Sequence, residues 1–185
     1  MGEIQMAFWR RLDRPGHDAA RLVHEPDGPF LEGYAAFSER GPTGLHYRVA
    51  LAPDWTARSA VVEGHRAGVA FRHELARTEG AWVLDGVAVP GLEDVVHLDF
   101  GFTPATNLPQ LRHAGLRIGA EAEVDAAWFD VGEETLVRLP QTWRRIAADR
   151  YWYRSPTAGY EAVLEVAESG FIVRYPGLWA LEREA

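Results

Sequence analysis

The chain has 185 residues, a formal net charge of -8, no cysteine and no lysine. The missing residue types exclude disulfides, thiolate chemistry and Schiff bases, and no basic stripe for nucleic acid is visible. This length favours one domain over residues 1–185. No run approaches the about 18 apolar residues of a membrane span, and the start MGEIQMAFWRR lacks the pattern of a secretory signal. We therefore expect a cytoplasmic protein without an integral membrane segment.

Short runs of alternating apolar and polar residues follow one another along the chain, with turns rich in Gly, Pro and Asp between them. Alternation places successive side chains on opposite faces, which is typical of β-strands covered on one side. The clearest case runs from Leu45 to Leu51, whose odd-numbered residues are all apolar. We expect roughly ten to thirteen strands. In chain order the main ones are Phe8–Arg11, Ala20–His24, Phe30–Glu39, Leu45–Leu51, Trp55–Glu63, Val69–Arg77, Ala81–Leu84, Val95–Phe102, Ala120–Asp130, Leu136–Ile146, Tyr151–Tyr153, Ala162–Ala167 and Phe171–Tyr175.

A helix is predicted over residues 106–114. Thr106 and Asn107 offer side-chain caps at its start, and Pro109 is tolerated there because the first turn needs no N–H donor. Gly115 is a plausible left-handed stop at its end.

The strand before this helix alternates between an apolar face and a polar face that carries His97 and Asp99. Such a strand suits an antiparallel sheet with one covered side. Gln141–Asp149 has some helical propensity, but its aromatic and β-branched neighbours favour a hairpin. Together the elements predict a mainly β fold, a single curved antiparallel sheet forming a half-barrel or nearly closed barrel. A barrel too wide for its own side chains to fill holds a ligand.

Several segments of the chain resemble those of one bacterial family. They are Phe8-Trp9-Arg10, Tyr47-Arg48-Val49, Asp54-Trp55, Leu98-Asp99, the corner Thr103-Pro104-Ala105-Thr106-Asn107-Leu108-Pro109, Arg150-Tyr151 and Val173-Arg174-Tyr175-Pro176-Gly177-Leu178. In this order they resemble the putative glycolipid-binding family, and the resemblance covers almost the whole chain. It implies a half-barrel similar to the bacterial lipoprotein carriers, in which a curved sheet wraps an apolar cavity, and it implies a glycolipid as ligand.

Asp99 is the most suggestive ionisable residue. If it faces inward, its carboxylate can fix a ligand hydroxyl or act as a general base with a raised pKa. If it faces outward, it is a cross-strand partner for an arginine, and Arg48, Arg58 and Arg72 are candidates. Asn107 suits a helix cap as well as a ligand contact.

The seven tryptophans and six tyrosines supply large apolar area with polar tips. Such side chains suit a cavity that holds an acyl chain or stacks a sugar ring, and they suit an ordinary core equally well. The seven histidines show no metal-like spacing and no cofactor motif is present, so we expect neither a metal nor a cofactor.

The leading hypothesis is a non-catalytic protein that binds a lipid, glycolipid or other amphipathic small molecule in the cavity of the curved sheet. Two alternatives stay open: a small barrel hydrolase or isomerase that uses Asp99 with a histidine or arginine, and an assembly protein or homo-oligomer that pairs through open sheet edges. The expected ligand contacts are Tyr47, Arg48, Trp55, Arg58, Phe71, Asp99, Phe100, Asn107, Trp128, Tyr151 and Tyr153.

Overall fold

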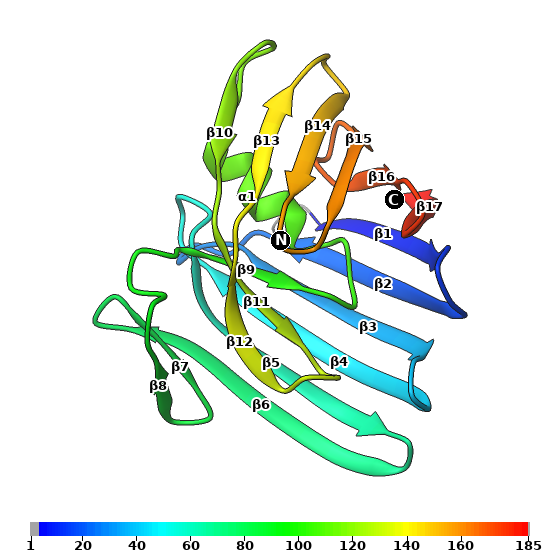
Figure 1. The fold of residues 1–185 in the computed structure, drawn as a ribbon, viewed down its shortest axis with the longest axis vertical. Helices are drawn as coiled ribbons and strands as arrows, with labels where there is room; N and C mark the ends of the chain where they lie inside the picture. Colours follow the sequence, from blue (N-terminus) through cyan, green and yellow to red (C-terminus); the bar gives the residue numbers. More distant parts are fainter. Residues whose placement is uncertain (1–3, 185) are drawn as a thin grey trace.

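The computed structural model describes residues 4–184, which form two β-sheets and one helix, α1 (Asn107–Ala114) (Figure 1). The strands are β1 (Ile4–Arg11), β2 (Gly16–Val23), β3 (Phe30–Ser38), β4 (Pro42–Leu51), β5 (Ala57–Arg66), β6 (Val69–Thr78), β7 (Ala81–Leu84), β8 (Val87–Val89), β9 (His97–Phe100), β10 (Glu121–Glu123), β11 (Ala126–Asp130), β12 (Thr135–Leu139), β13 (Thr142–Arg145), β14 (Arg150–Ser155), β15 (Tyr160–Val166), β16 (Ile172–Tyr175) and β17 (Trp179–Glu184). The predicted mainly β fold is confirmed.

The larger sheet has 14 strands in the order β10-β13-β14-β15-β16-β17-β1-β2-β3-β4-β5-β6-β7-β8, and every pairing in it is antiparallel. Strands β1 to β8 are neighbours in chain order, as a meander requires. Within residues 4–184 the outer strands β10 and β8 do not pair with each other. The sheet therefore stays open and does not close into a barrel.

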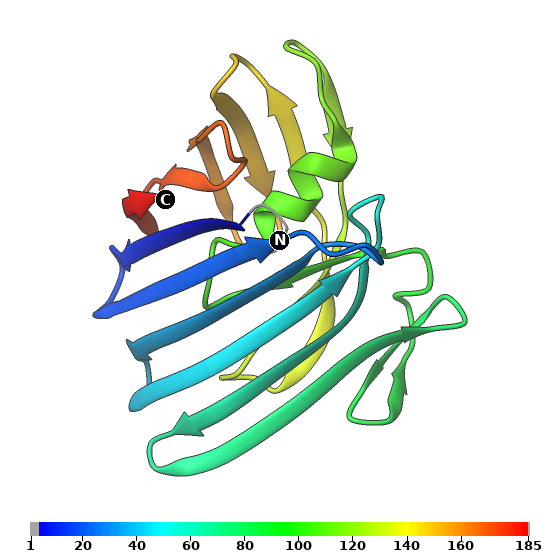
Figure 2. The ribbon, with the colours of Figure 1, turned by 180° about the vertical axis from the view of Figure 1, so that it is seen from behind.

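A second sheet of three strands, in the order β12-β11-β9, lies against the first. It lies in front of β2–β5 in Figure 1 and behind them in Figure 2, so it covers one face of the large sheet. Its strands β9 and β11 are parallel, because the chain crosses over through α1 and β10 between them. The alternation of apolar and polar residues led to the prediction of a single sheet and did not reveal this second one. All four residues of β9 are buried, so the polar face expected there is internal.

The helix begins one residue after the predicted start and ends as predicted, with Gly115 left-handed at φ 53°. Thr106 precedes it but makes no side-chain cap. Its hydroxyl instead accepts a hydrogen bond from the N–H of Phe100 and donates one to Asp99, each at 3.1 Å. The corner that was expected to cap the helix therefore ties it to β9.

The segment predicted as one strand over Leu136–Ile146 is interrupted at Pro140, which has no N–H to offer a sheet. Strand β12 before the interruption belongs to the small sheet, and β13 after it belongs to the large one. The predicted hairpin over Gln141–Asp149 is confirmed by the antiparallel pairing of β13 with β14.

The core lies between the two sheets. The odd-numbered residues of β4 point into it as predicted, and Tyr47 is fully buried there. The ring of Tyr47 lies edge-on to Phe100 of β9 and to Phe102, with centroids 6.0 and 5.7 Å apart. The small sheet thus fills much of the concavity of the large one. No helix within residues 4–184 is long and apolar enough to span a membrane.

Candidate ligand-binding site

A cavity of about 280 Å³ remains between the small sheet and strands β14–β17, and we call it the inner cavity. Most of its lining residues are aromatic or otherwise apolar, and Asp99 and Asn107 are among the polar side chains that reach it, from β9 and the first turn of α1. The aromatic lining residues are Phe100, Trp128, Tyr153, Tyr160, Tyr175 and Trp179. A wall of aromatic and other apolar side chains with a few polar groups is typical of small-molecule sites.

Three tyrosines form one side of the inner cavity. The ring centroid of Tyr160 lies 5.1 Å from that of Tyr175 and 6.1 Å from that of Tyr153, with the planes tilted by 52° and 48°. The hydroxyl of Tyr160 donates a 2.6 Å hydrogen bond to the carbonyl of Pro176, which fixes this ring. Burial raises the pKa of Tyr160 to about 12, so it stays protonated at neutral pH.

Asp99 has only 7% of its surface exposed, and its carboxyl is held by neutral donors. Thr106 donates to Oδ1 at 3.1 Å and the side-chain amide of Gln141 donates to Oδ2 at 2.6 Å. Gln141 is itself oriented by the indole N–H of Trp143, which donates to its Oε1 at 3.2 Å. Burial raises the pKa of Asp99 to about 6, although these hydrogen bonds act in the opposite direction.

A second hollow of about 420 Å³, the vestibule, adjoins the inner cavity. Both are lined by Gly101, Trp128, Ala158, Tyr160 and Leu178, so these residues form the boundary between them. The vestibule differs from the inner cavity because its rim is charged. The charged side chains are Arg11, Asp13, Arg14, Glu39, Arg40, Arg66, Asp130 and Glu133.

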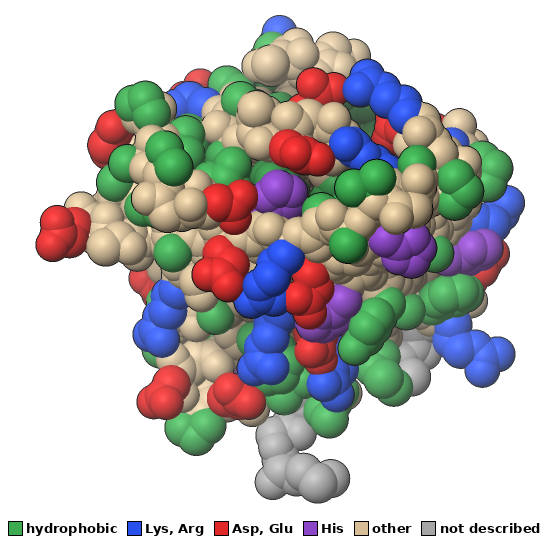
Figure 3. Space-filling model, turned by 90° about the horizontal axis from the view of Figure 1, so that it is seen from below, with side chains coloured by type: hydrophobic (Ala, Val, Ile, Leu, Met, Phe, Trp, Pro, Cys, Tyr) green, Lys and Arg blue, Asp and Glu red, His purple; other side chains and the backbone are tan. Residues whose placement is uncertain are grey.

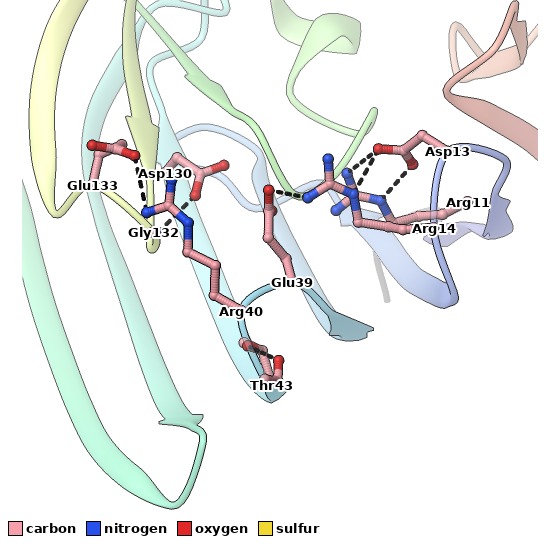
Figure 4. Close-up of polar contacts among 10 residues, drawn as sticks. Arg11, Asp13, Arg14, Glu39, Arg40, Thr43, Asp130, Gly132 and Glu133 are labelled. Carbon is pink, nitrogen blue, oxygen red and sulfur yellow. Dashed lines mark hydrogen bonds and ion pairs between the residues drawn. The ribbon is translucent and has the colours of Figure 1, made fainter.

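The charges of the vestibule come from the turns after β1, β3 and β11 and the residues beside them, together with Arg66 at the end of β5, and Figure 4 shows the charged side chains of the three turns. In the turn after β1, Arg11 binds Asp13 through two hydrogen bonds of 3.0 Å, and Arg14 binds Asp13 at 2.7 Å. Burial acts to raise the pKa of Asp13, but the two guanidinium groups outweigh it and the pKa lies below its usual range. Arg14 also pairs with Glu39 from the β3–β4 turn.

Asp130, at the end of β11, lies on the opposite side of the vestibule from this group (Figure 4). Its Oδ1 accepts a 2.7 Å hydrogen bond from the N–H of Gly132. Gly101 makes room for it, because a Cβ at position 101 would collide with Oδ2 of Asp130 and lie 3.0 Å from the ring of Trp128. Burial raises the pKa of Asp130, and the nearby negative charge of Glu39 adds to the effect.

Five of the residues expected to contact a ligand line the inner cavity, and they are Asp99, Phe100, Asn107, Trp128 and Tyr153. The structure places the other six elsewhere. Tyr47 belongs to the core, Arg48 lies over the ring of Phe30 on the exposed side of β4, and Arg58 is exposed on β5.

The remaining three also lie apart from the inner cavity. Trp55 contacts His24 and Arg112, Phe71 stacks on His73 of β6, and Tyr151 lines a separate hollow beside the end of α1. Asp99 does not reach Arg48, Arg58 or Arg72, since its carboxyl is turned toward Thr106 and Gln141. Of the two interpretations of Asp99, the structure therefore supports the one in which it faces inward.

Sequence reasoning missed Asp130, Tyr160, Tyr175, Trp179 and the vestibule arginines. One local signal was present, because Trp128 and Asp130 are two residues apart in a strand and so share a face. The arginines had no such signal, since their turns are brought together only by the fold. No group of three or more His, Asp or Glu side chains within residues 4–184 is arranged to hold a metal ion.

The rim of the vestibule carries both signs of charge. The face of the molecule seen from below shows a similar mixture, with acidic, basic, histidine and apolar side chains interspersed (Figure 3). Such a mixed face does not create the single-sign field that a highly charged polymer would recognise.

The fold and the two hollows define a class of protein, an open antiparallel β-sheet bent around an aromatic cavity with a charged entrance. The chain belongs to the family described as "Putative glycolipid-binding", which matches it over residues 6–180. The chain is also similar to the crystal structure of a DUF1089 family protein from Pseudomonas aeruginosa, with a TM-score of 0.76 and 28% sequence identity, over 88% of this chain and 91% of that one. No curated protein matches the chain.

Proposed function

We propose that the protein is a non-catalytic binder of a small amphipathic molecule of the lipid or glycolipid class. The observation that carries this proposal is that the two hollows adjoin and share lining residues. An aromatic cavity with a buried carboxyl lies next to a vestibule lined by charged side chains, and Trp128 and Tyr160 line both. A ligand with a polar and an apolar part can contact both compartments at once.

The size of the inner cavity limits the ligand. Its volume of about 280 Å³ lies just below the range of about 300–1,000 Å³ that is usual for small-molecule pockets. This space suits one ring or one compact head group. It does not suit the two long acyl chains of a bilayer lipid.

The polar groups of the inner cavity indicate which end of the ligand enters it. Asp99 and Asn107 reach the cavity wall, and buried polar groups are costly unless they find partners. Aromatic rings beside them can stack against a sugar ring. The vestibule has apolar side chains between its charged pairs, among them Phe37, Val131 and Leu178. We therefore infer that the head group lies inside and that the apolar part leaves through the vestibule.

The hydrogen-bond partners of Asp99 support a role in ligand binding better than a role in catalysis. An acid–base mechanism needs a partner that can exchange a proton near neutral pH. The hydrogen-bond donors to Asp99 are the hydroxyl of Thr106 and the amide of Gln141, which do not titrate in that range. A role in assembly through the edge strands β8 and β10 remains a prediction.

The proposal is tested by titrating the purified protein with octyl β-glucoside in a calorimeter and by searching solvent extracts of the protein for co-purifying lipid. We expect Trp128→Ala to weaken octyl β-glucoside binding at least tenfold, about 1.4 kcal/mol. Trp152→Ala is the matched control, because Trp152 is also half-buried but bonds Glu161 and lies under Arg144, away from the cavity. No binding and no co-purifying amphiphile, or an equal loss in the control, would contradict the proposal.

A further inference from the structure

The charges of the inner cavity are not balanced within it. Asp99 and Arg138 are the ionisable side chains of its lining that carry charge at neutral pH. Arg138 is held at the outer rim, where it pairs with Asp94 and Asp125 and donates to the carbonyl of Gly91. Two carboxylates therefore already compensate this guanidinium, and the donors to Asp99 are both neutral.

The vestibule is different, because most of its charged side chains have a partner of opposite charge. Arg11 and Arg14 share Asp13, and Arg40 pairs with Glu133 at 3.5 Å. Asp130 is the exception, since its carboxyl accepts a hydrogen bond from the N–H of Gly132 and makes no ion pair within residues 4–184. The carboxylate that a ligand can compensate inside the inner cavity is therefore that of Asp99.

The aromatic walls of the inner cavity also favour a cation. Aromatic faces carry partial negative charge and attract ammonium groups within about 6 Å of the ring centroid. The ring centroids of Tyr153, Tyr160 and Tyr175 lie 5.1–6.1 Å from one another with mutual tilts of 48–73°, so the three rings pack together as one aromatic side of the cavity. Trp128 and Trp179 add two indoles to this enclosure. The ring of Trp179 already holds one cation, the guanidinium of Arg11 at 4.9 Å, whose charge Asp13 balances.

We propose that the inner cavity selects a positively charged head group of the organic ammonium class, held between the aromatic walls and the carboxylate of Asp99. This inference rests on the proposed function and specifies its ligand. A neutral sugar can donate hydrogen bonds to Asp99 but leaves its charge uncompensated, whereas an ammonium group compensates the charge of a carboxylate that is only 7% exposed.

The carboxylate is ionised in the range where the protein would be assayed. The pKa of Asp99 is about 6, so most molecules carry the charge at pH 7.5. The titratable groups that face it are Tyr153 from β14 and Tyr175 from β16. Burial raises the pKa of both hydroxyls above the usual value, so neither loses its proton near neutral pH.

The test compares two probes of nearly equal shape, choline and its uncharged isostere 3,3-dimethylbutan-1-ol, by calorimetric titration of the full chain at pH 7.5. We expect choline to bind at least tenfold more tightly than the isostere. Asp99→Asn should reduce this ratio to less than threefold. Asp149→Asn, which removes the same charge from an exposed turn, should leave the ratio unchanged. Thermal melting checks that the variants fold. If Asp99→Asn does not fold, the ratio of choline affinity to isostere affinity in the unaltered protein decides whether the inference holds.

The two proposals fail in different ways. If octyl β-glucoside binds but choline binds no better than the isostere, the cationic head group is wrong and the amphiphile-binding function stands. If octyl β-glucoside, choline and the isostere all fail to bind and no amphiphile co-purifies, the proposed function fails with it. An equal choline preference in Asp99→Asn would also overturn the inference, because the carboxylate would then not be its cause.

Discussion

The hydroxyl of Tyr47 donates a 2.9 Å hydrogen bond to Oδ2 of Asp18, and both side chains are fully buried. Thr103, at the corner before α1, donates to the same oxygen. Oδ1 of Asp18 is buried without a hydrogen-bond partner among residues 4–184. No ion pair within the described residues balances this group, and burial raises the pKa of Asp18 to about 7.

Stability should therefore depend on pH through Asp18. An unfolded aspartate loses its proton near pH 4, whereas the folded protein keeps it to about pH 7. Between these values the folded state binds more protons, so the free energy of unfolding falls as pH rises. We expect the free energy of unfolding to decrease by a few kcal/mol in total. The slope should be on the order of 1.4 kcal/mol per unit of pH over the range in which the carboxyl is protonated in the folded state but not in the unfolded state. Urea unfolding followed by circular dichroism at intervals from pH 4 to pH 8 measures this decrease.

Asp18→Asn is the control for this effect, since it keeps an oxygen acceptor and removes the titration. Between pH 4 and 6 the stability of the variant should change little, because Asp99 and His97 act in opposite directions there: burial raises the pKa of Asp99 to about 6 and lowers the pKa of His97 to about 4. Above pH 6 its stability should not fall. A variant as pH-dependent as the unaltered protein across pH 6–8 would show that Asp18 is not the cause.

Gly33 in β3 is required by Tyr47 in the next strand. A Cβ at position 33 would collide with the phenol ring of Tyr47, which cannot move because its hydroxyl is fixed to Asp18. We expect Gly33→Ala to lower the free energy of unfolding by about 1–3 kcal/mol, the usual cost of overpacking. In the control Gly44→Ala the new methyl group would meet only the imidazole of His65 at 3.0 Å, and this side chain can turn away. Equal losses for the two variants in urea unfolding would contradict the explanation.

Gly101 should control passage between the two hollows. A methyl group at this position would press on the carboxyl of Asp130, which lines the vestibule, and on the indole of Trp128, which lies at the boundary. We expect Gly101→Ala to weaken octyl β-glucoside binding about tenfold, or about 1.4 kcal/mol. Calorimetric titration beside Gly44→Ala, which lies far from the cavity, measures the loss. Unchanged affinity in a folded variant would mean that the ligand does not cross this boundary.

Choline affinity should fall at acidic pH. An ammonium group binds the ionised form of Asp99, and this form becomes rare as pH drops below its pKa of about 6. We expect nearly constant affinity from pH 7 to 8 and an approximately tenfold loss for each unit below about pH 5.5. Calorimetric titrations at a series of pH values measure this, and Asp99→Asn should give a weak and flat profile. Asp18→Asn should keep the pH dependence, since Asp18 lies behind Thr103 and outside the cavity lining.

Local patterns in the sequence were sufficient to predict the β class, most strand positions and the helix. Alternation along β4 gave the buried face that contains Tyr47, because a strand directs successive side chains to opposite sides. Pro109 and Gly115 bounded the helix, because their backbone preferences act within one turn. Both effects are set by residues that are close together in the chain, so they can be predicted from a single sequence.

The tertiary structure decided what covers each face and which residues share the site. Asp99 meets Gln141, which lies 42 positions further along the chain, and the inner cavity joins β9 and β11 to β14–β17. The vestibule joins the turns that carry Arg14, Glu39 and Asp130. Alternation distinguishes two faces of a strand but does not say whether water, a second sheet or a ligand lies against them. For this reason the polar face of β9 was visible in the sequence, and only the fold showed that it is turned inward.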